Sequence, residues 1–250
     1  MMELILTLLA ALLIGLCLGL FGSGGSIMTV PVLLYLLKLP EKIAIASALG
    51  VVALISLVAL IPYLYRRHLQ WVLLFKLALP GMLGAWVGSW ASHFVAAQWQ
   101  LLLLALLMSL SALNMWQQQI WQWPLKRSWQ IVLVGFLLGC LTGFVGVGGG
   151  FLIVPLLLAV TSLSMSAAIA TSLALVLLQS SVGFVGHYQQ LALQGQQLDL
   201  TLIGMLGGLG ALGSMLALAL HQKLPQSLLR RIFALLLLGL GTSLLWRHFL

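Results

Sequence analysis

The chain has 250 residues, of which 62% are hydrophobic and only 6% are charged, and its mean hydropathy is +1.18. A water-soluble protein carries about 25% charged residues, so this composition excludes one and predicts an all-α polytopic membrane protein. The net charge of +8 does not indicate nucleic acid as a partner, because the eleven Lys and Arg residues are scattered between apolar segments and form no basic face.

Apolar segments follow one another along the chain, five in each half. Hydropathy predicts them at about 4–21, 26–37, 43–64, 72–94 and 99–116, and then at about 130–145, 150–161, 166–186, 200–220 and 229–246. The tryptophan-rich linker Asn114–Gln130 carries Lys126 and Arg127 and is typical of a membrane interface. We expect one membrane domain made of repeat one, residues 1–120, and repeat two, residues 128–250.

The two halves share a glycine motif at a constant spacing. Gly15–Pro31 reads GLCLGLFGSGGSIMTVP, and Gly139–Pro155 reads GCLTGFVGVGGGFLIVP. The same spacing joins AIASAL at Ala44–Leu49 to AIATSL at Ala168–Leu173. The chain is therefore predicted to contain two copies of one unit.

Other glycines are expected to pack helices together. Gly15 and Gly19 lie four apart on one face of the first segment, which is the small-xxx-small pattern of close helix contacts in membranes. A weaker repeat joins GMLG at 81–84 to GMLG at 204–207, with the spacing shifted by one residue. The prediction is that these positions correspond.

The second segment of each half is too short to span. About a dozen residues make roughly 18 Å of helix, against a hydrocarbon core of about 30 Å. Either the first two segments form one broken span, or they fold back as a re-entrant hairpin. A hairpin gives three spanning helices per half and inverted repeats, about 8–10 helical segments in all, with both termini outside.

Charge favours the hairpin, because Lys and Arg gather in cytoplasmic loops. A broken span would divide the basic residues almost evenly between the two sides. A hairpin places eight on one side and three on the other. The eight are Arg66, Arg67, Lys76, Lys126, Arg127, Lys223, Arg230 and Arg231, and the three are Lys38, Lys42 and Arg247.

The compact glycine clusters are candidates for a substrate-binding site. Consecutive glycines weaken a helix, and a loop at membrane depth followed by a helix start would direct free N–H groups and a positive dipole end at one point. The predicted backbone donors to an anion are Gly22, Ser23, Gly24, Gly25, Ser26, Gly146, Gly148, Gly149 and Gly150. The alternative is that these glycines only allow close packing.

Hydroxyl groups could complete such a site. Ser47, Thr171 and Ser172 are the polar members of the AIASAL and AIATSL motifs. They are predicted as further substrate-binding residues, or else they bond back to their own or a neighbouring helix.

The remaining polar residues indicate no catalytic group, metal site or cofactor. Cys17 and Cys140 are expected to be small buried hydrophobes. His187 is expected to anchor a helix end at the interface, the alternative being a group that couples transport to protons. Lys76 is expected to extend to the cytoplasmic surface, the alternative being a buried counter-charge for an anion. All three acidic residues are predicted near the surface, so a cation would lack intramembrane ligands and an anion is the better substrate.

At Gly22–Pro31 and Gly146–Pro155 the chain resembles the TauE/SafE (sulfite exporter, TSUP) family. Both copies follow G-x-G-G-G-x-x-x-x-P, except that Ser26 stands where Gly150 stands in the second. The resemblance implies a transporter, and we expect a secondary carrier in the bacterial inner membrane whose partners are the lipid bilayer and a small sulfur-containing anion such as sulfite or sulfoacetate. The alternatives are a passive anion channel and a membrane-embedded redox or assembly subunit.

Overall fold

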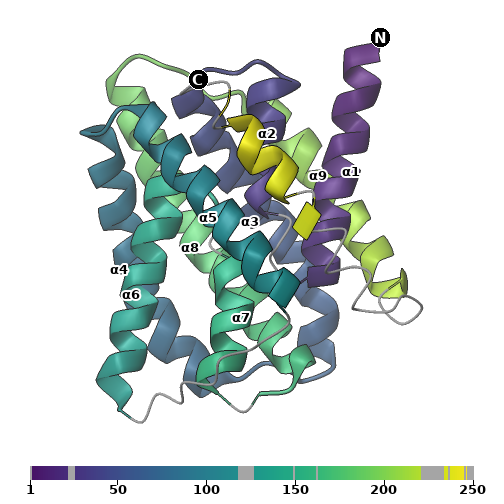
Figure 1. Cartoon of the computed structure of the whole chain (residues 1–250), viewed down its shortest axis with the longest axis vertical. Coiled ribbons are helices and arrows are strands. Elements are labelled where there is room, and N and C mark those ends of the chain that lie inside the picture. Colours follow the sequence, from purple (N-terminus) through teal and green to yellow (C-terminus); the bar gives the residue numbers. More distant parts are fainter. Residues whose placement is uncertain are drawn as a thin grey trace.

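The computed structural model of the chain is a bundle of helices (Figure 1). It describes residues 2–21, 26–117, 127–148, 150–161, 163–220, 234–235, 237–244 and 246. Its labelled helices are α1 (Met2–Phe21), α2 (Ser26–Tyr35), α3 (Glu41–Tyr65), α4 (Trp71–His93), α5 (Ala97–Gln117), α6 (Ser128–Val145), α7 (Gly150–Val160), α8 (Met165–Leu193) and α9 (Leu200–Leu220). Residues 234–235 and 237–244 are also helical. Within the described residues there are helices and no strands, which confirms the all-α class.

Five of these helices are long and apolar enough to cross a membrane. They are α3, α4, α6, α8 and the Leu200–Ala217 part of α9. α4 exposes large apolar side chains, among them Phe75, Leu79 and Leu83, as a surface facing lipid does. α2 and α7 have only 10 and 11 residues, so the short second segments are confirmed. The chain is a multi-pass membrane protein.

The two most extensive helix contacts each join one half of the chain to the other. α4 packs along α6, and α1 packs along α9. α3 and α8 lie between these outer pairs in Figure 1, and they contact each other. The halves are therefore interleaved, and neither forms a separate body.

α4 and α6 run in the same direction with their backbones touching. A Cβ atom on Gly139 would lie 1.9 Å from the Gly81 carbonyl oxygen, and one on Gly143 would lie 2.0 Å from that of Ala85. Residue numbers rise together along both helices, so the helices are parallel. Only glycine allows this separation, and such contacts hold helices together in lipid, where the hydrophobic effect between helices is weak.

α1 and α9 repeat this arrangement. A Cβ atom on Gly15 would lie 1.7 Å from the Gly210 carbonyl oxygen, and one on Gly19 would lie 2.7 Å from that of Ser214. These helices are also parallel. The prediction that Gly15 and Gly19 pack helices is confirmed.

α3 runs opposite to both α4 and α8. The Lys42 ammonium, at the start of α3, donates to the Ser92 carbonyl oxygen at the end of α4 at 2.5 Å. Just after α8, the Gln194 amide donates to Nδ1 of His93 at 3.1 Å. One end of the bundle thus holds the start of α3 and the ends of α4 and α8.

These contacts give every central helix a direction. α9 runs parallel to α3, because Gly50 lies against Ile203 and Gly207 against Leu54. Hence α1, α3 and α9 run one way, and α4, α6 and α8 run the other. Figure 1 shows the same opposition, since α1 starts at the top of the view and α6 at the bottom.

The directions bear on the choice between a broken span and a hairpin. α1 and α3 are parallel although only α2 lies between them, and α6 and α8 are parallel although only α7 lies between them. A broken span would make α3 antiparallel to α1. Parallel helices require the chain to return between them, so the arrangement favours the hairpin, and it is the one that inverted repeats need.

The predicted correspondence of the two GMLG motifs is wrong. A Cβ atom on Gly84 would lie 2.1 Å from the Phe136 carbonyl oxygen, and one on Gly213 would lie 2.2 Å from that of Leu12. Phe136 and Leu12 stand 124 positions apart, but Gly84 and Gly213 stand 129 apart. α8 has 29 residues where α3 has 25, so the second half gains residues before α9, and the GMLG glycine at Gly204 faces open space.

Candidate functional site

The second glycine loop is buried inside the bundle. α6 ends at Val145, and Gly146 follows with φ +74°, a left-handed conformation that favours glycine. Its N–H donates to the Thr142 carbonyl oxygen at 3.0 Å and so caps the helix. A Cβ atom there would lie 2.2 Å from Cγ2 of Ile45 on α3. Conformation and packing both require glycine at this position.

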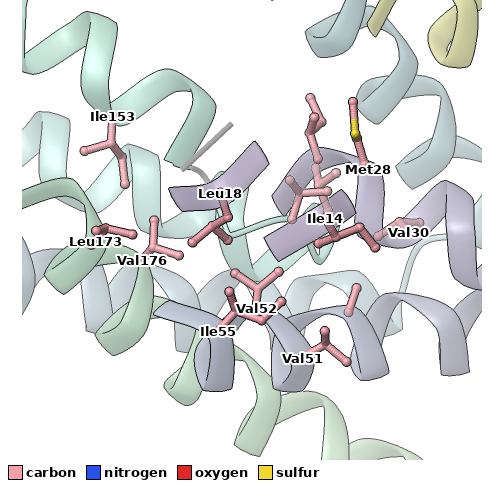
Figure 2. Packing of buried hydrophobic residues seen from close by; sticks show 14 of the residues in the cluster. Ile14, Leu18, Met28, Val30, Val51, Val52, Ile55, Ile153, Leu173 and Val176 are labelled. Atoms are coloured by element: carbon pink, nitrogen blue, oxygen red, sulfur yellow. The ribbon is translucent and has the colours of Figure 1, made fainter. Parts of the chain in front are cut away.

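Gly148 lies where both halves of the chain meet. A Cβ atom on Gly148 would be 2.7 Å from Cγ1 of Val52 on α3, and 2.9 Å from both Oγ of Ser180 and Cγ1 of Val176 on α8. These residues lie near the middle of their long helices. Figure 2 shows Val52 and Val176 converging beside Leu18 of α1. The loop therefore sits at the centre of the bundle, away from its ends.

The other predicted backbone donors fall in two groups. Ser26 is the first residue of α2 and is fully buried, and Gly150 is the first residue of α7. The rest lie outside the described residues. These are Gly22, Ser23, Gly24, Gly25 and Gly149.

The three predicted hydroxyl residues are buried, but the structure separates them. Ser47 stands two positions after Ile45 on α3, so its side chain points to a different face from the Ile45 side chain that touches Gly146. Thr171 and Ser172 come eight or nine residues before Ser180, roughly 12 Å along α8 at 1.5 Å per residue. Thr171 donates to the carbonyl oxygen of Ala167 in its own helix at 2.8 Å, which is the alternative considered for it. Oγ of Ser172 has no hydrogen-bond partner in the described part of the chain.

Sequence reasoning did not select Ser180 and Ser56 for the site. Both are fully buried, and Oγ of each lacks a partner among the described residues. They stand 124 positions apart, on α8 and α3, as Val176 and Val52 do. This spacing, applied beyond the glycine motifs, is the signal that would have found them. A hydroxyl buried without a partner is costly, so its retention at the centre favours a binding role.

Gln179 and Thr142 form a polar pair next to this loop. Oγ1 of Thr142 donates to Oε1 of Gln179 at 3.3 Å, and both side chains are fully buried. Nε2 of Gln179 has no partner within the described residues. The polar groups near the loop are thus uncharged amides and hydroxyls, and the two without a partner among the described residues, Nε2 of Gln179 and Oγ of Ser180, can both donate to an anion.

The prediction that His187 anchors a helix end at the interface is wrong. α8 continues to Leu193, so His187 lies inside the helix and is only 3% exposed. Its Nε2 lies 2.7 Å from the Gly143 carbonyl oxygen, so Nε2 carries the proton and donates. His187 therefore joins α8 to the last turns of α6. Lys76, by contrast, is exposed on α4.

Comparison with known proteins agrees with this architecture. The family model described as "Sulfite exporter TauE/SafE" matches residues 7–244. A "Probable membrane transporter protein" of Xylella fastidiosa (strain Temecula1) is 34% identical, with 98% of this chain and 96% of that protein covered. The "Probable membrane transporter protein YunE" of Bacillus subtilis is 24% identical, with 98% of each covered. No solved structure matches significantly. The chain belongs to the sulfite exporter TauE/SafE family and is a multi-pass membrane transporter.

Proposed function

We propose that the protein is a secondary transporter that exports small sulfur-containing anions, such as sulfite, sulfoacetate or related organosulfonates, across the bacterial inner membrane. The observation that carries this proposal is the burial of Gly146 and Gly148 at the centre of the bundle, against helices of both halves. The family match supports transport, and its description supports a sulfur oxyanion as the substrate.

The donors around the second loop support binding of an anion. α7 starts at Gly150, two residues after Gly148, whose Cβ position lies 2.9 Å from the unpartnered Ser180 hydroxyl. The first N–H groups of a helix have no partner within the helix, and its N-terminus carries the positive end of the helix dipole. The Ser180 hydroxyl is fully buried beside Gly148 and supplies a side-chain donor in addition to the backbone donors of the helix start. We also propose Gly22 to Gly25 as backbone donors to the anion, because they occupy the corresponding positions in the first copy of the glycine motif.

The helix directions support alternating access. The two halves are proposed to be inverted repeats, so each conformation opening to one side has a counterpart opening to the other. The glycine contacts unite α4 with α6 and α1 with α9 more closely than α3 with α8. We therefore place the movement at the α3 and α8 contact, with the two outer pairs each moving as a unit.

The test is uptake and counterflow in proteoliposomes with sulfite, thiosulfate, sulfoacetate and taurine. We expect saturable counterflow for at least one anion, and Ser180→Ala should reduce that uptake several-fold, since a hydrogen bond contributes about 0.5–1.5 kcal/mol. The control is Ser214→Ala, because the fully buried Ser214 hydroxyl bonds to Ala211 of its own helix at 2.7 Å.

Three results would contradict the proposal or its binding site. Flux without saturation or counterflow would identify a passive channel. No flux, together with haem or flavin absorbance of the purified protein, would identify a redox subunit. Equal uptake in Ser180→Ala and Ser214→Ala would remove the loop from the binding site.

A further inference from the structure

The two halves differ chemically at one matched pair of positions near the centre. A Cβ atom on Gly81 of α4 would lie 2.2 Å from Nε2 of Gln179 on α8. A Cβ atom on Gly210 of α9 would lie 2.3 Å from Cδ1 of Ile55 on α3. Gln179 and Ile55 stand 124 positions apart, and each faces a glycine of the other half. The packing is the same, but one half supplies a carboxamide and the other a hydrocarbon.

A second matched pair differs in the same sense. Thr142 of α6, which bonds to Gln179, stands 124 positions after Leu18 of α1. Leu18 and Ile55 are both fully buried, and Figure 2 shows them close to Val52. A polar Thr142 and Gln179 in half two thus correspond to an apolar Leu18 and Ile55 in half one.

The Gln179 amide is held in place but incompletely bonded. Its Oε1 accepts from Thr142, while its Nε2 has no partner among the residues described, although the side chain is fully buried. Its neighbour in sequence, Ser180, also carries an unpartnered hydroxyl and lies beside Gly148. Two consecutive buried residues with free donors, next to the glycine loop, are costly until an oxygen of a ligand or of a bound water accepts from them, and a ligand that displaces such a water takes over its hydrogen bonds.

We infer that Gln179 is a binding residue for the oxyanion group of the substrate, and that the two halves contribute unequally: half two adds the Gln179 carboxamide to the donors that the halves share, while half one presents Leu18 and Ile55 to the rest of the molecule. This inference rests on the proposed function. The matching ligand has an oxygen-rich anionic end and an apolar end, as an alkanesulfonate has. A symmetric tetrahedral anion such as sulfate would leave hydrated oxygens facing Leu18 and Ile55.

Gln100 provides a matched control. It is also a fully buried glutamine, but it lies at the end of the bundle with both amide atoms bonded. Its Oε1 accepts from Lys42 at 3.0 Å, and its Nε2 donates to the Ser92 carbonyl oxygen at 3.2 Å. Loss of its side chain should disturb folding and leave the centre intact.

The experiment compares Gln179→Leu and Gln100→Leu with the unchanged protein in proteoliposomes, using ethanesulfonate, sulfite and sulfate as probes. Gln179→Leu should raise KM for ethanesulfonate at least tenfold and leave the Tm without ligand unchanged or higher, because an unbonded amide is removed. Gln100→Leu should lower Tm and leave KM unchanged. The unchanged protein should prefer ethanesulfonate to sulfate at least tenfold.

The outcomes separate this inference from the proposed function. If the unchanged protein transports none of these three anions and none of thiosulfate, sulfoacetate and taurine, the proposed function fails, and this inference with it. If it transports some of them but not ethanesulfonate, only the two-ended ligand is overturned. If it transports them and Gln179→Leu keeps the original KM, only the role of Gln179 is overturned. Equal KM for sulfate and ethanesulfonate would overturn the two-ended ligand. Should Gln179→Leu fail to fold, Thr142→Val replaces it, since loss of the Thr142 hydroxyl releases the Gln179 amide and should also raise KM.

Discussion

Gly146 shows two separate requirements for glycine in one residue. Its φ of +74° disfavours any other side chain, and Ile45 occupies the space where a Cβ atom would lie. Gly195, between α8 and α9, has nearly the same φ of +70° but nothing within 4 Å of its Cβ position. Replacing Gly195 would therefore introduce only backbone strain, whereas replacing Gly146 would introduce both backbone strain and a packing clash.

We expect Gly195→Ala to lower the free energy of unfolding by about 1–2 kcal/mol, the cost of a left-handed conformation for an L-residue. Gly146→Ala should lower the free energy of unfolding by more than Gly195→Ala does, because the methyl group also collides with Ile45. Thermal unfolding of both variants in detergent gives the comparison. Equal Tm values for the two variants would mean that the loop does not pack against α3 as described.

At the scale of helices, glycine decides which ones can be neighbours. α9 carries two kinds of glycine, since Gly213 touches the Leu12 carbonyl oxygen of α1 while Gly204 faces open space. Sequence alone does not distinguish them. The GMLG motif suggests that Gly204 matches Gly81, yet the helix contacts match Gly81 with Gly210.

Gly213→Ala should therefore separate α1 from α9 and reduce both Tm and the yield of folded protein. Gly204→Ala, in the same helix, should be neutral or stabilising by up to about 1 kcal/mol, because alanine favours helix over glycine. Thermal unfolding and gel-filtration profiles provide the readout. A larger fall in Tm for Gly204→Ala than for Gly213→Ala would contradict the contact between α1 and α9.

At the scale of the whole molecule, the number of crossings decides which loops share a side. With hairpins, three crossing helices, α4, α5 and α8, separate the loop after α3 from the loop after α8. With broken spans, α6 and α7 together make a fourth crossing between these two loops. Hairpins thus place Gln70 and Gln196 on opposite sides, and broken spans place them on the same side.

We expect cysteines at these two exposed positions to react from opposite faces of the membrane. In a background with Cys17→Ala and Cys140→Ala, Gln196→Cys should react with a membrane-impermeant maleimide added outside, and Gln70→Cys only after permeabilisation. Gln70 follows Arg66 and Arg67, which should lie in the cytoplasm. Labelling of both from one face would rule out the hairpin and the inverted repeats.

Much of this architecture follows from local features of the chain. Hydropathy alone sets the number and length of apolar helices, since each must satisfy its backbone internally in lipid. The glycine motif and its spacing of 124 residues indicate the repeat, the short second helices and the loop at Gly146–Gly148, because consecutive glycines weaken a helix wherever they stand.

Contacts between distant helices depend on the tertiary structure. Only there does His187 become buried against Gly143, and only there do Ser180 and Gln179 prove to carry unbonded donors beside the loop. The reason is that an apolar helix in lipid has no polar face to show which side is inside, so close backbone contact between small residues sets its orientation. The sequence by itself determined an all-helical multi-pass membrane protein with two copies of a glycine motif, and the tertiary structure decided which polar residues meet at its centre.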